Sequence, residues 1–61
     1  MSAQQAGRLA TDRCRGRVLG VEPDTAQGAP VWEAEIADSR EGPIEVDIDQ
    51  RTGATMEIEH D

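Results

Sequence analysis

The sequence has little material from which to build a hydrophobic core. It contains one Trp and no Phe or Tyr among its 61 residues. Leu, Ile, Val and Phe together fall below the roughly 20% under which a highly charged chain tends to be disordered. A chain of this length buries only about 60% of the surface that its unfolded form exposes. We therefore expect at most one small domain with a thin core.

Cysteine and histidine are equally scarce. Cys14 is the only cysteine, so no internal disulfide can stabilise the fold, and we expect it to act as a small apolar residue on a helix face. His60 is the only histidine and lies far along the chain from Cys14. Metal and catalytic sites need a set of partner residues, which the sequence does not supply around either one. The sequence thus predicts no catalytic residue, no metal ligand, no cofactor and no enzymatic activity.

Long apolar runs are missing as well. No stretch is long enough for a transmembrane helix, so no membrane insertion is expected. Residues 1–7 do not resemble a signal peptide, and the chain as written would stay in the cytoplasm. A mature or shortened fragment that had lost an export signal would look the same, so the compartment stays open.

Positive charge is confined largely to the first part of the chain. Residues 1–17 carry four Arg and one Asp, a net charge of +3, whereas residues 18–61 carry two Arg and twelve carboxylates, a net charge of −10. Nucleic acid is not expected as a partner, because neutralising phosphates needs a basic surface. A basic peptide, a basic protein surface or a divalent cation fits this charge, and so does a solvated surface that keeps the domain soluble.

The N-terminal segment has the spacing of a helix. Ser2 is a suitable N-cap, and Gly16 is placed to end the helix. The spacing predicts a helix over about residues 3–14, although Gly7 weakens it by about 1 kcal/mol relative to Ala. Small or apolar residues recur on one face, at Ala3, Ala6, Leu9, Ala10 and Cys14.

Four strands are expected after the helix, over about residues 17–22, 31–37, 43–49 and 54–59. In the first, Leu19 and Val21 should share one face, and residues 23–30 have the composition of a loop. In the other three, apolar and acidic residues alternate, which places the apolar side chains on one face and the carboxylates on the other. Trp32 alternates in phase with Ala34, which predicts a core position; the alternative is an exposed anchor for a partner.

The connections favour hairpins between successive strands. Residues 38–43 form a hairpin loop, and residues 50–53 form a tight turn in which Gly53 can adopt positive φ. The expected fold class is α+β, with one N-terminal helix packed on a three- to four-stranded antiparallel meander sheet.

Three segments together resemble the PepSY domain. They are residues 16–22, 31–36 and 44–53, and the most specific is the run from Ile48 and Asp49 to Thr52 and Gly53. The resemblance covers nearly the whole chain and implies a single PepSY-like domain over residues 1–61. Trp32 replaces the family's common Tyr, and Arg15 replaces its usual Pro.

PepSY domains occur in metallopeptidase propeptides and in bacterial cell-envelope proteins, usually outside the cytoplasm. The resemblance implies a non-catalytic protein-interaction or regulatory module that modulates a peptidase, as a propeptide or an inhibitor does, or an envelope partner. The alternatives are a carboxylate-rich Ca²⁺-binding domain and a structural fragment of a larger envelope protein. It brings no catalytic motif to this chain.

The polar sheet face is the candidate binding site. It is expected to carry Glu33, Glu35, Glu45, Asp47, Asp49, Glu57 and Glu59. Such a face suits a basic peptide or Ca²⁺, which takes several oxygen ligands, or it is simply solvated. Residues 47–53 do not form an EF-hand loop, because Arg51 and Thr52 stand where an oxygen ligand and Gly are required.

The Asp49, Thr52 and Gly53 signature is instead expected in the turn after the third strand. The two edge strands of the sheet have free backbone groups, to which an extended peptide or a second copy of the chain could add.

Overall fold

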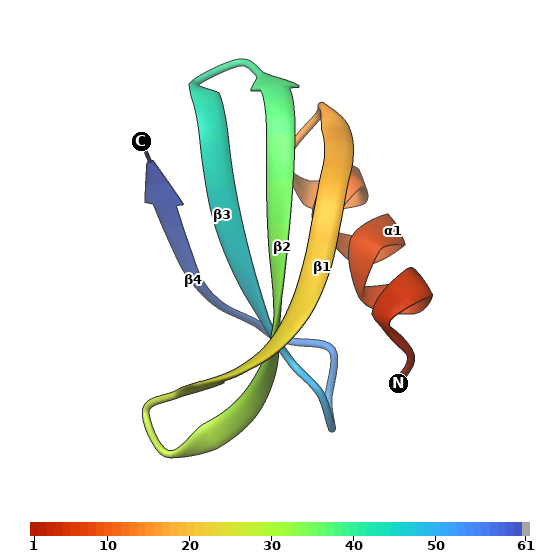
Figure 1. The fold of residues 1–61 in the computed structure, drawn as a ribbon, viewed down its shortest axis with the longest axis vertical. Helices are drawn as coiled ribbons and strands as arrows, with labels where there is room; N and C mark the ends of the chain where they lie inside the picture. The colour runs from red at the N-terminus through yellow and green to blue at the C-terminus, as the bar shows by residue number, and fades with distance from the viewer. Residues whose placement is uncertain (61) are drawn as a thin grey trace.

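The computed structural model describes residues 1–60 and shows one helix followed by one antiparallel sheet (Figure 1). The expected α+β class is confirmed. The sheet is a meander in which each strand pairs with the next, in the order β1-β2-β3-β4. The elements are α1 (Ala3–Arg13), β1 (Arg17–Ala26), β2 (Ala29–Ser39), β3 (Gly42–Asp49) and β4 (Thr55–His60).

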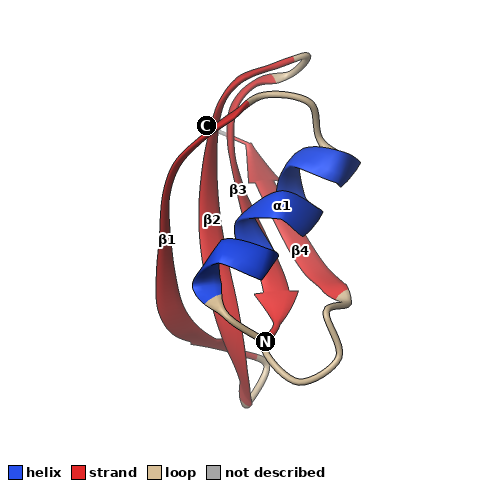
Figure 2. Ribbon diagram, turned by 90° about the vertical axis from the view of Figure 1, so that its right-hand side faces the viewer, coloured by secondary structure: helices blue, strands red, loops and turns tan. Residues whose placement is uncertain are grey.

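Helix α1 lies across one face of the sheet (Figure 2). Ser2 caps it, because its Oγ accepts from the Gln5 backbone N–H at 3.1 Å while the Gln5 side chain accepts from the Ser2 N–H at 2.8 Å. The helix packs mainly on β1 and β2 and less on β3, through the buried small residues Ala6, Gly7 and Ala10. No helix in residues 1–60 is long and apolar enough to cross a membrane.

The core is the layer between α1 and the sheet. Alternate residues of β2 and β3 face the helix in cross-strand pairs, such as Ala34 with Val46 and Ile36 with Ile44, and all four are buried. Trp32 packs against this cluster while partly exposed, and its indole Nε1 donates to the Met1 carbonyl at 3.1 Å. Trp32 therefore lies on the predicted side of the sheet, at the border of the core rather than inside it.

Strand β1 departs from the expected alternation at Leu19. The pairing with β2 shifts register between Val18 and Gly20, so Leu19 occupies a β-bulge and is 59% exposed. Val18 and Val21 pack against the core instead. The prediction that Leu19 and Val21 share one face was wrong, because one inserted residue reverses the alternation.

The prediction that residues 23–30 form a loop was also wrong. Strand β1 continues to Ala26 and β2 starts at Ala29, joined by Gln27 and Gly28 with φ of 53° and 78°. Positive φ at both central residues is typical of the two-residue turn that matches the twist of a hairpin. Both strands are thus longer than expected, with Asp24 paired with Val31 in the added part.

Gly16 lets the chain pass closely over β2 after the helix. A Cβ added there would lie 2.4 Å from Ile36 Cγ2 and 2.5 Å from the Ala37 carbonyl oxygen. Neither atom can move far, since Ile36 is buried and Ala37 pairs with Arg17. The connection from α1 to β1 therefore needs a residue without a side chain at position 16. Gly16 does not end the helix, which already ends at Arg13.

We predict that Gly16→Ala lowers the free energy of unfolding by about 2 kcal/mol, the usual cost of forcing extra atoms into a packed site. Urea unfolding followed by circular dichroism measures it. Gly20→Ala is the matched control, because a Cβ there meets nothing within 4 Å. Equal stability of the two variants would show that the close approach at Gly16 carries no energetic weight.

Candidate functional site

The outer face of the sheet, opposite α1, carries two rows of carboxylates that run across the strands. In the first row, Glu35 on β2 pairs with Glu45 on β3, which pairs with Glu59 on β4. The second row crosses all four strands, through Glu22, Glu33, Asp47 and Glu57. Side chains directly opposite each other on an antiparallel sheet have Cβ atoms about 5 Å apart, so each row brings like charges together. These seven residues and Asp24 are called the acidic face below.

Six of the seven predicted site residues lie on the acidic face, and the seventh, Asp49, does not. Two members were missed, Glu22 and Asp24. Asp24 was assigned to a loop, although the dipeptide Gln27-Gly28 is a hairpin signal that would have extended β1 through it. Glu22 lies in the expected first strand, where its pairing with Glu33 depends on the register that the Leu19 bulge sets.

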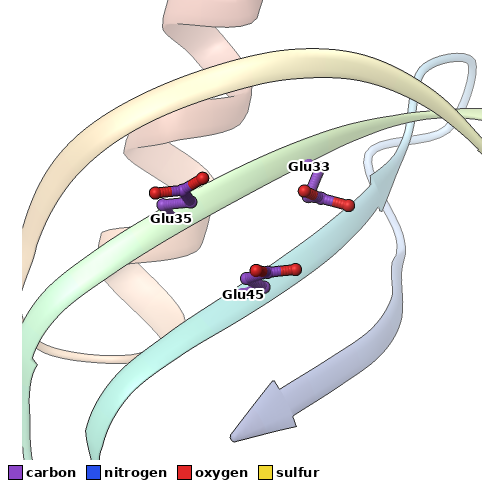
Figure 3. Close-up of side chains that lie close together, drawn as sticks. All are labelled: Glu33, Glu35 and Glu45. Atoms are coloured by element: carbon purple, nitrogen blue, oxygen red, sulfur yellow. The ribbon is translucent and has the colours of Figure 1, made fainter. Parts of the chain in front are cut away.

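Glu33, Glu35 and Glu45 form the tightest group on this face (Figure 3). One carboxylate oxygen from each lies within 4.8 Å of the other two. Glu33 and Glu45 are partly buried, and Glu35 is exposed. The sequence assigned no individual metal ligand but left Ca²⁺ binding to this face as an alternative, and three convergent carboxylates supply oxygen donors for such a hard cation.

The environment of Glu33 opposes its ionisation. Partial burial, the charge of Glu45, and a side-chain hydrogen bond with Asp24 together raise the pKa of Glu33 from 4.5 to about 7. Desolvation is the largest cause, since a charged carboxylate loses water contacts that the neutral acid needs less. The pKa of Asp47 is also raised, first by desolvation and then by Glu59 and Asp24. Ionising both Glu33 and Asp47 therefore lowers the stability of the folded state.

Asp49 serves the turn after β3 rather than the acidic face. Its side chain is turned back, so that Oδ1 accepts from the backbone N–H of Arg51 at 2.7 Å and of Thr52 at 3.1 Å. These hydrogen bonds hold the pKa of Asp49 below its usual range. The residue is 6% exposed, which leaves little of it for a partner. The expectation that Asp49 belongs to the exposed binding face was wrong.

Thr52 and Gly53, the other two residues of the signature, also stabilise the turn after β3. Gly53 has a φ of +78°, as predicted, and its N–H donates to the Asp49 carbonyl at 2.9 Å. Thr52 Oγ1 accepts from the Ala54 N–H at 3.2 Å. The Asp49, Thr52 and Gly53 pattern thus builds the β3–β4 turn and, through it, positions β4 beside β3.

Two arginine ion pairs lie away from the two rows. Arg17 is 3.6 Å from Asp38 beside the β2–β3 hairpin, and Arg51 is 3.9 Å from Asp49 in the turn. His60 Nε2 contacts Glu41, also at that hairpin. Arg17 and Arg51 therefore lie at the ends of the sheet, while the acidic face collects carboxylates from all four strands.

Comparison of the chain with family models, with curated proteins and with solved structures finds no match. The resemblance to PepSY domains stays a prediction.

We predict that Glu33→Gln stabilises the fold at about pH 8 by on the order of 1 kcal/mol, after allowance for solvent screening. A carboxyl whose folded pKa is raised binds its proton more tightly in the folded state. Its contribution to stability therefore falls as pH rises from about 4.5 to about 7 and then levels off. The gain from Gln should grow over the same window, which urea unfolding at a series of pH values measures.

Glu57→Gln is the matched control for this prediction. It makes the same chemical change in the same row, at an exposed position on the edge strand. A smaller effect is expected there. Equal gains at both positions would mean that overall negative charge, rather than the surroundings of Glu33, sets the effect.

Proposed function

We propose that the protein is a non-catalytic protein-interaction module that receives a basic segment of a partner protein on its acidic face. The observation that carries this proposal is the pair of carboxylate rows, which extends over all four strands. Arg and Lys side chains form charge-assisted hydrogen bonds with carboxylates, roughly twice as strong as neutral ones. A basic partner would place positive charge beside these carboxylates.

The energetics of the face support the same proposal. Like charges directly opposite each other destabilise a sheet, and here they recur in consecutive pairs from β2 to β4. Glu33 and Asp47 lie in the middle strands, where their pKa values are raised. A bound cation lowers the cost of ionising them, so the face gains stability from a basic partner in addition to the contacts themselves.

The PepSY resemblance extends the proposal to the kind of partner. Domains of that family are thought to restrain peptidases or to bind envelope proteins, and the same role is proposed for this chain. A peptidase that carries a basic surface near its substrate cleft would fit the acidic face. The proposal assigns no residue a catalytic role.

A ¹⁵N–¹H correlation spectrum recorded during titration with a short Lys- and Gly-containing peptide tests the interaction. Peak shifts should concentrate on the acidic face, and affinity should fall with salt because exposed charges are screened. The double variant Glu33→Gln/Glu45→Gln should bind about tenfold more weakly, since two charge-assisted contacts are lost. An acidic peptide of equal length should not bind.

The control for that experiment is the double variant Asp12→Asn/Asp38→Asn, which removes the same charge from exposed positions on the helix and the β2–β3 hairpin. It should retain most of the affinity. Equal losses in both double variants would contradict a located site and would leave only attraction by net charge.

A second candidate function is cation binding at Glu33, Glu35 and Glu45, and the 4.8 Å grouping of their oxygens favours it. In that case CaCl₂ should raise the melting temperature saturably, by a few degrees, as a ligand does that binds only the folded state. Glu35→Gln should remove the shift. An equal shift with MgCl₂ or in the variant would contradict a Ca²⁺ site, because Mg²⁺ demands stricter geometry.

A further inference from the structure

The outer edge of β4 is an open strand edge in the part of the chain that the structure describes. β4 pairs with β3 on one side and is the last strand in the order. From Glu57 to His60 its register with β3 is regular, and the irregularity lies before it, between Asp47 and Ile48 on β3. A regular edge with unpaired backbone groups is a template for another extended strand.

The opposite edge, β1, is less open to a new strand, because its irregularity lies further inside the strand than the one at the start of β4 and because it contains a proline. Its pairing is interrupted by the bulge at Leu19, and Pro23 has no backbone N–H to offer. Both features are known to block the addition of a strand. An added strand would therefore be directed to β4.

The helix-facing side of β4 is incompletely covered. Helix α1 packs on β1, β2 and β3, and Ile58 on β4 is 37% exposed. Beside it lies a groove of about 490 Å³ between the C-terminal end of α1 and the β2–β3 hairpin, with Cys14, Ile44 and Ile58 among its lining residues. An apolar side chain from a neighbouring strand would find an apolar surface there.

The two sides of β4 have opposite charge. On the outer side, Glu57 and Glu59 belong to the acidic face. On the helix side, the groove is lined by three arginines, Arg13, Arg15 and Arg40, against two carboxylates, Asp12 and Glu41, the second of which contacts His60. An added strand therefore meets negative charge on one side and apolar surface with a positive rim on the other.

The charges on the two sides of β4 determine which sequence of an added strand would fit. Side chains of a strand alternate between the two sides of a sheet, so basic residues at every second position would face Glu57 and Glu59. The residues between them would face Ile58 and the groove, where a basic side chain would meet the arginines. A shift by one residue would place every side chain on the wrong side.

A second copy of this chain is a poorer occupant. Antiparallel pairing of two β4 strands about Ile58 would set Glu57 of one copy opposite Glu59 of the other, twice. Like charges directly opposite each other are destabilising. A strand with Lys or Arg at those positions has the complementary charge.

We propose that the β4 edge binds an extended segment of a partner protein in which basic and apolar residues alternate, as an added strand of the sheet. This rests on the proposed function and adds a backbone contact at β4, beside Glu57 and Glu59, to the contacts that the partner makes on the rest of the acidic face. Backbone hydrogen bonds along β4 supply affinity, and the two unlike sides of β4 supply register and orientation. The partner strand then lies beside β4, with its basic side chains next to the carboxylates of the acidic face.

The test compares two peptides of the same composition and about the length of β4. In one, Lys and Val alternate; in the other, the Lys residues precede the Val residues. The alternating peptide should bind at least about tenfold more tightly, because only it can pair all its side chains correctly. Backbone amides of β4 should become protected from hydrogen exchange when it binds.

Variants of the two exposed edge residues locate the binding. Ile58→Ser on β4 should reduce the preference for the alternating peptide, whereas Leu19→Ser, on β1 and 59% exposed, should not. A correlation spectrum of each free variant checks that it is folded. If Leu19→Ser reduced the preference and Ile58→Ser did not, the proposal would be overturned.

Equal affinity for the two peptides would overturn strand addition and leave recognition of basic segments standing. Binding of neither would overturn both proposals. Protection of the β4 amides in a concentration-dependent dimer without peptide would also overturn this one, because the edge would then belong to a second copy.

Discussion

The whole molecule depends on burying one face of the sheet under a helix whose buried residues are all small. Ala6, Gly7 and Ala10 bring α1 close to the sheet, and the apolar residues of β2 and β3 fill the layer between. Because strand side chains alternate with a period of two, this burial also decides where every carboxylate lies. The acidic face is thus the reverse side of the core, and neither can change register without the other.

The parts of the fold that follow from alternation could be predicted from sequence. Residues 31–36 and 44–49 alternate apolar and acidic side chains with few exceptions, and the shared helix-facing side of Ala34, Ile36, Ile44 and Val46 follows from it. The helix cap at Ser2 and the positive φ of Gly53 could also be predicted from the sequence, because each depends only on neighbouring residues.

The parts that were missed depend on contacts between strands. Gly20, inside the first strand, is a signal that was passed over, since an isolated glycine in a strand often marks a bulge. The bulge lets both Val18 and Val21 reach the core, and that benefit appears only when α1 and β2 are in place. Prolines at positions 23 and 30 suggested a loop, yet both lie in strands, paired with Trp32 and Thr25. The tertiary pairing outweighed local composition there.

Asp49 shows a local interaction outweighing the strand pattern. Alternation assigned it to the outer face, paired with Val31, but two backbone N–H groups in the following turn capture its carboxylate. A charge-assisted hydrogen bond to an otherwise unpaired N–H is worth more than exposure to water. Sequence reasoning recognised the Asp49, Thr52 and Gly53 signature but could not decide between these two roles for one side chain.

Asp49 and Glu33 have pKa values shifted in opposite directions, and the contrast connects stability with the proposed function. Backbone donors stabilise the ionised form of Asp49, whereas burial and neighbouring carboxylates favour the neutral form of Glu33. Protons and basic side chains both relieve the repulsion on the acidic face, so they compete for it. A basic partner that binds near Glu33 therefore displaces its proton, and the affinity of the proposed complex rises with pH up to about 7. The charge that weakens the isolated fold is the same charge that favours the complex.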